Sequence, residues 1–479
     1  MTFGLDYLSV VELKKLLSGK KVSVVGLGVS NVPAIDFLNR CGAVVTGCDR
    51  RTKDEMSDEL FARLNRECDE LHLGEDYLDY LDGEDMILKS PGILPIPKQI
   101  SDARANGTVL TSEMELFMMS CPCKIIGVTG SDGKTTTTTL ISKFIAESNY
   151  VCHVGGNIGN PLLAQIEQIN DTDIVVLELS SFQLMNMRVS PDIAVVTNVS
   201  PNHLDHHRDM TEYVEAKANI FTHQGKDGKL IVNRENTITA SFIGRQNGRV
   251  LTFSSIDTRA DACVKDGYLC LGDKKYVRAE DIFIKGRHNV ENYLAAIAAT
   301  EGLVGPSVVE KVAKTFHGVE HRMEFVRKKD GIEFYNDSIG SSPTRTIAGL
   351  TAHEGKIVLI AGGYDKNLNY NELAAVIRDR VSALVLVGDT AKKIKTAVNR
   401  VYGKTPDIPI VVCNSFDDVV PSAYVLARAL VDARTDSGEK ISVILSPASA
   451  SFDMFKNFEE RGKKFKQLVN DLDNGSFGE

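Results

Sequence analysis

The sequence predicts an α/β protein made of three domains, each with a largely parallel sheet. Its 479 residues are too many for one hydrophobic core, since domains average roughly 150 residues. Short β-branched runs alternate with helix-like stretches along the chain, which is typical of βαβ units. One such run in each of the first two domains ends in a glycine-rich turn. We place the domains at 1–112, 113–318 and 319–479.

The first domain begins with the strand Lys20–Gly26 (KKVSVVG), which ends at a glycine turn before a helix-like stretch. A second strand is expected at Ala43–Asp49, and a third at Met86–Leu88, shortly before Ser90-Pro91-Gly92. This rhythm predicts a Rossmann-like sheet, whose ligand site lies at the carboxyl ends of the strands.

The turn Gly26-Leu27-Gly28-Val29-Ser30-Asn31 nearly matches the dinucleotide fingerprint, with Asp49 placed 21 residues after the second glycine. An asparagine replaces the third glycine, which counts against an NAD-dependent oxidoreductase. An anion site at a helix N-terminus remains. The adjacent Arg50 and Arg51 suit a ligand with more negative charge than NAD, although a solvated charge cluster would look the same.

The central domain contains the sharpest motif. Its expected strands lie at 123–128, 173–179 and 193–198, followed by shorter runs at 230–232, 250–253 and 268–271 and by a helix that begins near residue 289. The first strand runs into Gly130-Ser131-Asp132-Gly133-Lys134-Thr135-Thr136. Such glycines let backbone N–H groups converge on phosphate oxygens at a helix N-terminus.

In this loop Lys134 would neutralise the β- and γ-phosphates, and Thr135 would bind Mg²⁺. The position five residues before Gly133 is Val128 rather than glycine, so the spacing is the tighter TGxxGKT[ST]. The motif predicts a P-loop-type ATPase domain; a glycine-rich turn that merely caps a helix is the alternative.

Further polar residues follow two later strands at the same expected sheet edge. Glu178 closes one strand, where an acidic residue commonly faces the nucleotide's Mg²⁺. The segment Asn198–His207 (NVSPNHLDHH) follows another and contains three histidines. Lys217 lies on an expected helix, Glu212–Phe221, and its pattern alone predicts a surface lysine.

The third domain again alternates strands and helices, which predicts a second Rossmann-like fold. Its strands are expected at 331–335, 356–361, 383–387, 410–413 and 441–445.

Composition narrows the function classes. The hydrophobic share of 43% and charged share of 25% are those of globular proteins. A net charge of −9 argues against a nucleic-acid binder but allows a local anion site. No stretch approaches the ~20 apolar residues of a membrane span, and the N-terminus has no signal pattern. Of the nine cysteines only Cys121 and Cys123 are close neighbours, so we expect reduced thiols and a cytoplasmic location.

Taken in order, the motifs resemble the Mur ligase family along the whole chain. They are TGSDGKTTT, HVGGNIGNP (153–161), LELSSFQL (177–184), NVSPNHLDHH (198–207), EAKANIF (215–221), RHNVENYLAA (287–296), EHRME (320–324) and YNDSIGSS (335–342). The segment 445–465, LSPASASFDMFKNFEERGKKF, is similar to the members that add D-glutamate. The resemblance implies an ATP-dependent ligase of peptidoglycan synthesis that joins D-glutamate to UDP-N-acetylmuramoyl-L-alanine through an acyl phosphate, giving ADP and phosphate.

The resemblance also assigns roles to single residues. Catalytic roles fall on Lys134, Asn157, His203, Lys217 and His321. Two Mg²⁺ ions would be bound by Thr135, Glu178, His203 and a carbamylated Lys217. ATP would contact Gly130, Ser131, Asp132, Gly133, Lys134, Thr135, Thr136, Asn289, Asn292, Arg322 and Asp337. The UDP substrate would contact Gly28, Val29, Ser30, Asp49, Arg50, Arg51, Ser90, Gly92 and Asn157, and D-glutamate would contact Ser341, Lys366, Ser451, Phe452 and Phe458.

Two positions depart from the family pattern. Ile339 stands where the family frequently has lysine, and Ser341 replaces a threonine, so Ser342 or Arg345 could supply contacts there instead. We expect a monomer that binds small molecules, with no nucleic-acid or membrane partner.

Other functions remain as alternatives. Folylpolyglutamate synthases and other Mur ligases share the central ATP domain but are not expected to carry the 445–465 segment. A non-catalytic nucleotide sensor would keep both glycine turns, but it would not need Lys134, Glu178, His203 and Lys217 together. Phosphate release that requires both the muramyl substrate and D-glutamate distinguishes these functions.

Overall fold

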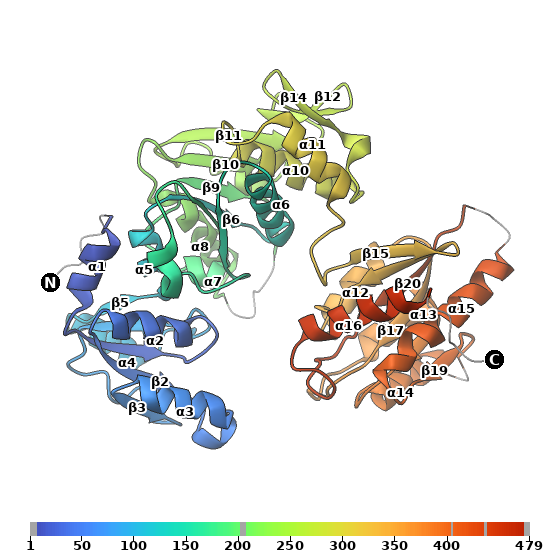
Figure 1. Ribbon diagram of the computed structural model, residues 1–479, viewed down its shortest axis with the longest axis horizontal. Helices are drawn as coiled ribbons and strands as arrows, with labels where there is room; N and C mark the ends of the chain where they lie inside the picture. The colour runs from blue at the N-terminus through green and yellow to red at the C-terminus, as the bar shows by residue number, and fades with distance from the viewer. Residues whose placement is uncertain (1–6, 202–206, 404–405, 435–437, 474–479) are drawn as a thin grey trace. The chain divides into compact units, whose positions relative to one another are not determined.

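The protein is described here by a computed structural model that covers residues 7–201, 207–403, 406–434 and 438–473. The chain forms two compact units, Met1–Phe316 and His317–Glu479. A five-stranded and a nine-stranded sheet lie in the first unit, and a six-stranded sheet lies in the second (Figure 1). Most neighbouring strands are parallel, which confirms the predicted three-domain α/β fold class.

The first sheet is parallel throughout and has the order β3-β2-β1-β4-β5. Its strands are β1 Lys21–Val25, β2 Val44–Asp49, β3 Glu70–Leu73, β4 Met86–Lys89 and β5 Val109–Thr111. The helices of this part are α1 Val10–Leu17, α2 Asn31–Arg40, η1 Lys53–Glu55, α3 Asp58–Glu67 and α4 Lys98–Ala105. The chain leaves β1 towards β2 on one side and returns through β4 on the other, so the topological switch point lies between β1 and β4.

The second sheet has the order β14-β13-β12-β11-β10-β9-β6-β8-β7. Its strands are β6 Lys124–Thr129, β7 Cys152–Gly156, β8 Ile174–Glu178, β9 Ile193–Val196, β10 Lys229–Asn233, β11 Arg249–Ser254, β12 Ala262–Lys265, β13 Tyr268–Leu271 and β14 Lys274–Arg278. Only the β12–β13 and β13–β14 pairs are antiparallel among the described pairings. Because β6 lies between β8 and β9, the carboxyl ends of these three strands meet at one edge.

The helices of the central part are α5 Glu113–Ser120, α6 Lys134–Ala146, η2 Leu163–Gln168, α7 Ser181–Leu184, α8 Met210–Thr222, α9 Thr237–Ala240, η3 Ala279–Asp281, α10 Arg287–Ala299 and α11 Pro306–Thr315. One apolar core runs from the first sheet into this part and includes Phe37, Phe117 and Leu163. Arg40 adds a polar link, because it donates to the carboxylate of Glu167 (2.9 Å). This shared core accounts for the single compact unit.

The second unit is built on the order β15-β16-β20-β17-β18-β19. Its strands are β15 Glu324–Lys329, β16 Ile332–Asn336, β17 Lys356–Ala361, β18 Val381–Leu386, β19 Ile410–Val412 and β20 Ile441–Leu445, with β15 antiparallel to β16. Its helices are α12 Pro343–Ala352, α13 Asn371–Arg380, α14 Ala391–Tyr402, η4 Phe416–Asp418, α15 Val419–Ala433 and α16 Phe458–Asp471.

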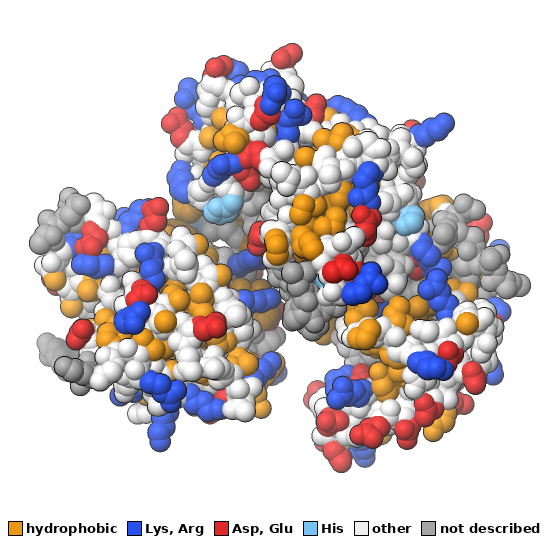
Figure 2. Space-filling model, turned by 180° about the vertical axis from the view of Figure 1, so that it is seen from behind, with side chains coloured by type: hydrophobic (Ala, Val, Ile, Leu, Met, Phe, Trp, Pro, Cys, Tyr) orange, Lys and Arg blue, Asp and Glu red, His pale blue; other side chains and the backbone are white. Residues whose placement is uncertain are grey.

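The sheets fall inside the three predicted segments, but the boundaries at 112 and 318 stay a prediction. Compactness divides the chain only between Phe316 and His317. Acidic and basic side chains are intermixed on the face seen in Figure 2. Within the described ranges, no helix combines the length and the apolar character needed to span a membrane.

Candidate active site

The glycine-rich loop after β6 has a backbone that only glycine fits at two points. Gly130 has a φ of +152° and Gly133 a φ of +78°. A Cβ atom on Gly130 would lie 1.9 Å from Thr197 Oγ1, and one on Gly133 would lie 2.4 Å from Asn292 Oδ1. The loop therefore leads into α6 with its backbone closely packed against the neighbouring elements, as a phosphate cradle requires.

Residues that follow β9 hold this loop in place. Thr197 Oγ1 donates to the carbonyl oxygen of Asp132 (2.6 Å), and the Asp132 N–H donates to Asn198 Oδ1 (2.9 Å). Ser131 Oγ donates to the carbonyl oxygen of Ser200 (2.9 Å). The sequence does not predict the roles of Thr197 and Asn198 in fixing the loop. Their position at the end of the strand beside β6 is the signal that could have found them.

Two lysine ammonium groups meet at one carbonyl of the loop. Lys134 Nζ and Lys217 Nζ each donate to the carbonyl oxygen of Gly130 at 2.8 Å, and Lys134 Nζ also donates to that of Ser131 (2.9 Å). Lys217 is 1% exposed, so the prediction of a surface lysine from its pattern alone is wrong. Burial and the nearby charge of Lys134 lower the pKa of Lys217 to about 7.

Glu178 lies at the carboxyl end of β8 and is 1% exposed. Its Oε1 accepts a hydrogen bond from Asn157 Nδ2 (2.7 Å), whereas its buried Oε2 has no hydrogen-bond partner among the described residues. A bare, buried carboxylate oxygen is a ready ligand for a hard cation such as Mg²⁺. Glu178 therefore fits the predicted metal site.

The other predicted metal ligands are placed less fully. Thr135 and Thr136 lie in the half-buried first turn of α6, directly after Lys134. His203 lies outside the described residues. In the part of the chain that the structure describes, no three His, Cys, Asp or Glu side chains cluster around one point.

The two asparagines predicted on the adenine side lie on α10. Asn292 Oδ1 accepts a hydrogen bond from Thr137 Oγ1 on α6 (3.3 Å), and its Nδ2 donates to Asn289 Oδ1 (3.3 Å). Asn289 Nδ2 in turn donates to the carbonyl oxygen of Lys285 (2.8 Å). These side chains thus connect the start of α10 to the helix that follows the phosphate loop.

In the first sheet, Asp49 and Arg51 support the glycine turn rather than project from it. Asp49 Oδ2 accepts the Leu27 N–H (2.7 Å), and the Arg51 guanidinium binds both Asp49 oxygens (2.9 Å each) and the Leu27 carbonyl oxygen (2.7 Å). Of the other residues predicted here, Gly28, Val29 and Arg50 are exposed, and Ser30 is half-buried before α2. Asn31, which replaces the third glycine, is buried and donates to the Gly26 carbonyl oxygen (3.0 Å).

Lys89 closes β4 at the switch point and is only 5% exposed. Its Nζ donates to the carbonyl oxygens of Ser90 (2.8 Å) and Ile93 (3.1 Å), and so ties down the loop that contains Ser90 and Gly92. Burial lowers the pKa of Lys89 to about 8. Lys89 is not among the predicted site residues. A lone cation that ends the apolar run Met86–Lys89 is the signal for it.

If this loop binds the UDP substrate that the resemblance implies, replacing Lys89 by methionine should raise the KM for that substrate about tenfold with little change in kcat, because a hydrogen bond from a charged group contributes about 1.5–3 kcal/mol. Steady-state kinetics at varied UDP-substrate concentration measure the effect. Lys98→Met, an exposed position on α4, is the matched control. An unchanged KM, or a roughly tenfold decrease in kcat with no change in KM, would contradict the role of Lys89 in holding the loop.

In the second unit, Asp337 lies directly after β16 and is 5% exposed. Ser446 Oγ donates to its Oδ2 (2.7 Å), and the Met323 N–H donates to its Oδ1 (3.2 Å). Burial raises the pKa of Asp337 to about 6, and the bond from Ser446 and the charge of the exposed Arg322 oppose the shift only in part.

A carboxyl group with a raised pKa destabilises the fold when it ionises. Between pH ~4 and ~6 the folded unit binds more protons than the unfolded chain, so the free energy of unfolding falls as the pH rises through this window. The rise of the Asp337 pKa from its ordinary value of 3.8 to about 6 corresponds to about 3 kcal/mol. Asp337→Asn should therefore stabilise this unit by roughly 1–3 kcal/mol at pH 8 and hardly at all at pH 4.

Urea denaturation of the full chain at the two pH values measures this difference. Asp389→Asn, an exposed carboxyl group after β18, is the control. An equal effect of Asp337→Asn at both pH values would contradict the expected cost of its charge.

His321 is 4% exposed and has a left-handed backbone, with a φ of +63°. Asn336 Nδ2 lies 2.9 Å from His321 Nδ1, and since an amide NH₂ can only donate, this bond assigns the ring proton to Nε2. Nε2 lies 3.7 Å from a carboxylate oxygen of Glu320. Burial lowers the pKa of His321, so the ring is neutral at physiological pH.

The side chains predicted to bind the amino acid take part in two separate contacts. Lys366 Nζ lies 5.3 Å from the ring centroid of Phe452, which is 58% exposed. The Phe458 ring packs edge-on against His321, with centroids 6.0 Å apart. Ser451 is buried beside Phe452 in the chain. No described contact joins the two groups.

The loop that departs from the family pattern keeps a cation. Ser341 is half-buried, and its N–H donates to the carbonyl oxygen of Ile339 (2.7 Å). Arg345 Nη1 donates to the same oxygen (3.3 Å). Arg461, which is not among the predicted site residues, is fully buried and donates to the carbonyl oxygens of Ser338, Ser449 and Ala450. It joins this loop to the one after β20.

Comparison with known proteins matches three family models to the chain. The Mur ligase MurD-like N-terminal domain matches residues 20–112, the Mur ligase middle domain matches 128–300, and the Mur ligase glutamate ligase domain matches 321–433.

Solved structures of low sequence identity share the fold. A MurF from Acinetobacter baumannii superimposes with a TM-score of 0.55 at 15% identity, covering 97% of this chain and 98% of that one. The MurF ligase from Thermotoga maritima in complex with ADP gives a TM-score of 0.50 at 16% identity, covering 98% of this chain and all of that one.

The curated relatives are much more similar in sequence. The UDP-N-acetylmuramoylalanine--D-glutamate ligase of Acetivibrio thermocellus is 49% identical over 96% of this chain and 98% of its own. The enzyme of the same name from Clostridium acetobutylicum is 47% identical over the same shares. With identity of this extent, the chain belongs to the Mur ligase family, within the group of UDP-N-acetylmuramoylalanine--D-glutamate ligases.

Proposed function

We propose that this chain adds D-glutamate to UDP-N-acetylmuramoyl-L-alanine at the expense of ATP, as a cytoplasmic step of peptidoglycan precursor synthesis. One observation carries the chemistry: the bare, buried oxygen of Glu178 and the two lysines on Gly130 lie where the carboxyl ends of neighbouring strands meet. The choice of substrates rests on the names of the relatives. The chain acts as a monomer in this proposal.

In the first step, the carboxylate of the alanyl group attacks the γ-phosphorus of ATP, the bond to the β-phosphate oxygen breaks, and ADP leaves. Two unit negative charges 4 Å apart repel by about 4 kcal/mol at an effective dielectric constant of 20. Lys134 offsets part of this repulsion. Two Mg²⁺ ions, held by Thr135, Glu178, His203 and a carbamylated Lys217, would supply the remaining positive charge.

The environment of Lys217 supports its carbamylation. An ammonium group would repel Mg²⁺, whereas a neutral amine reacts with CO₂ to give an anionic carbamate and a proton. The lowered pKa of about 7 leaves a substantial neutral fraction at physiological pH. Burial at 1% exposure protects the product from water.

In the second step, the amine of D-glutamate attacks the acyl phosphate carbonyl, and phosphate leaves from the tetrahedral intermediate. The amine must lose a proton, and the neutral His321, whose orientation Asn336 fixes, is suited to orient or accept it. Lys366, with Ser341, Ser451, Phe452 and Phe458, would bind the amino acid and its two carboxylates.

The first sheet would bind the UDP moiety. The turn Gly28–Ser30 lies at the N-terminus of α2, which favours a diphosphate. Arg50, the Ser90–Gly92 loop and Asn157 would contact the rest of the substrate, and Asp49 and Arg51 would hold the turn. ATP would lie between the phosphate loop and the Asn289–Asn292 side of α10, and the resemblance adds Arg322 and Asp337 as nucleotide contacts.

The test is phosphate release by the purified chain with ATP and Mg²⁺. Release should require both UDP-N-acetylmuramoyl-L-alanine and D-glutamate, and L-glutamate or L-lysine should not replace D-glutamate. Release without either acceptor or donor would indicate a simple ATPase, and a preference for L-lysine would indicate a different ligase. Either result would overturn the proposal.

A further inference from the structure

Cys121 and Cys123 flank a proline in the segment that joins α5 to β6. Their Sγ atoms lie 3.7 Å apart and share a hydrogen bond, and Cys121 Sγ also donates to the carbonyl oxygen of Cys123 (3.6 Å). A disulfide needs a separation of about 2.0 Å. Each sulfur would therefore move by roughly 1 Å to form one.

A cavity of about 550 Å³ gives access to this pair. Both cysteines line it, together with Met118, Arg188 and Tyr7. Tyr7 is 62% exposed, so the cavity opens to solvent although the cysteines themselves are only 4% and 8% exposed. The volume is within the range of sites that hold small molecules.

The two thiols are chemically unequal. The hydrogen bond from Cys123 lowers the pKa of Cys121, and the same bond together with burial raises the pKa of Cys123. By contrast, burial raises the pKa of Cys152 to about 12. Since the thiolate is the nucleophile in thiol–disulfide exchange, Cys121 is the attacking group and Cys123 the resolving group.

A second pair of neighbouring cysteines lacks the two features that distinguish Cys121 and Cys123, the shared hydrogen bond and the access from a cavity. Cys263 and Cys270 lie opposite each other on β12 and β13. Each of these thiols donates to a separate backbone carbonyl, of Thr258 and Tyr268 respectively. Neither is among the residues that line the cavity. Opposite cysteines alone therefore do not provide a shared thiol bond with an access route.

We propose that Cys121 and Cys123 form a dithiol site that reacts with low-molecular-weight disulfides. The Cys121 thiolate attacks one sulfur of the disulfide and releases the first thiolate, which takes up a proton. Cys123 then loses its proton and attacks Cys121 Sγ, releasing the second thiolate. Two electrons pass from the protein thiols to the external disulfide, and the products are one protein disulfide and two small thiols.

The full-length protein, treated with oxidised glutathione, alkylated and digested with trypsin, tests the site. Cleavage after Arg104 and Lys124 gives the peptide 105–124, whose only cysteines are Cys121 and Cys123. This peptide should escape alkylation and lose about 2 Da relative to its reduced form, as an internal disulfide requires. The peptide that contains Cys152 should be alkylated under the same conditions, because this thiol is not expected to react with the disulfide.

Variants separate the two roles. Cys123→Ser should accumulate a glutathione adduct on Cys121, whereas Cys121→Ser should react slowly and Cys152→Ser should behave like the unchanged protein. A peptide 105–124 that is fully alkylated when other cysteines already carry adducts would overturn the proposal. So would a stable glutathione adduct on the unchanged protein, because Cys123 would then fail to resolve it. Neither outcome depends on ligase activity.

Discussion

Replacing Lys217 by methionine should lower turnover about 10³-fold or more while the protein remains folded. The variant loses the amine that we propose becomes an anionic metal ligand, but methionine still fills the space between Tyr213 and Phe221 on the buried face of α8. ADP release in the presence of both substrates measures turnover, and thermal unfolding checks the fold. Glu215→Gln, an exposed position on the same helix, is the control.

A second measurement links the effect to the carbamate. Removing CO₂ and bicarbonate from the buffer should reduce the activity of the unchanged protein, and adding bicarbonate should restore it. Lys217→Met should respond to neither treatment. Near-normal turnover of Lys217→Met, or an equal response of both proteins to bicarbonate, would rule out this role for Lys217.

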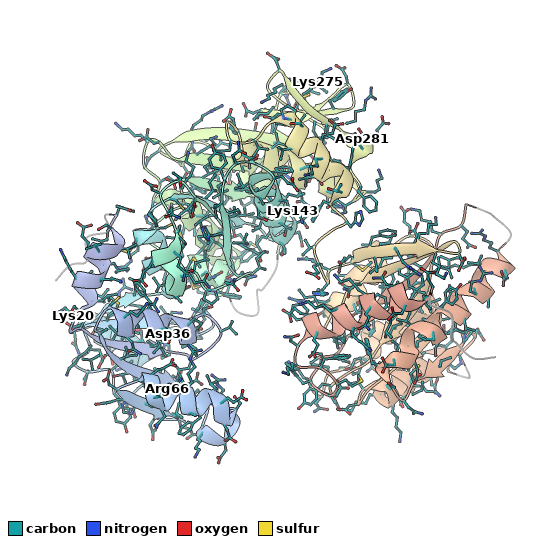
Figure 3. All side chains as sticks on the ribbon, viewed as in Figure 1. Lys20, Asp36, Arg66, Lys143, Lys275 and Asp281 are labelled. Atoms are coloured by element: carbon teal, nitrogen blue, oxygen red, sulfur yellow. The ribbon has the colours of Figure 1, made fainter. Side chains whose placement is uncertain are left out.

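Lys134→Met should also reduce turnover about 10³-fold, because it removes the charge that we propose faces the transferred phosphoryl group. Its Nζ also bridges the carbonyl oxygens of Gly130 and Ser131, so the variant loses part of the loop's support. Lys143→Met is the control on the same helix, since Lys143 lies on an exposed part of α6 (Figure 3).

Single-turnover measurements with saturating ATP separate binding from chemistry for Lys134. The phosphoryl-transfer step should remain slow at saturation, because the interaction is strongest in the transition state. If saturating ATP restored the normal rate, Lys134 would contribute to nucleotide binding alone, and the role proposed for it in the first step would be wrong.

The fold class can be predicted from local sequence patterns, but some of the strands cannot. The run Ile125–Thr129 before a glycine loop and a helix predicts β6, the loop and α6 together, because each pattern is continuous in sequence. The sequence does not predict β5, which has three residues, or β7, Cys152–Gly156, which ends in two glycines. Such strands depend on pairing with neighbours and not on their own propensity.

The residues of the site likewise divide into those that a local sequence pattern can identify and those that none can. Tyr213, Lys217 and Phe221 recur at four-residue spacing, so helical periodicity could have placed Lys217 on the buried face of α8. No comparable local signal identifies Arg461, because its role is to join the nearby loop at Ser449 to Ser338, which lies 123 residues away in the sequence. Roles that depend on such distant contacts appear only when the chain is folded.

The glycine at position 133 limits how this site can change by mutation. Any side chain there would collide with the Asn292 amide, and the backbone φ of +78° already disfavours other residues. A substitution that blocked a bound compound at this point would therefore also displace the Asn292 side chain, on which the proposed adenine contact depends. Compounds that rest directly on the Gly133 backbone should consequently meet little resistance arising from that position.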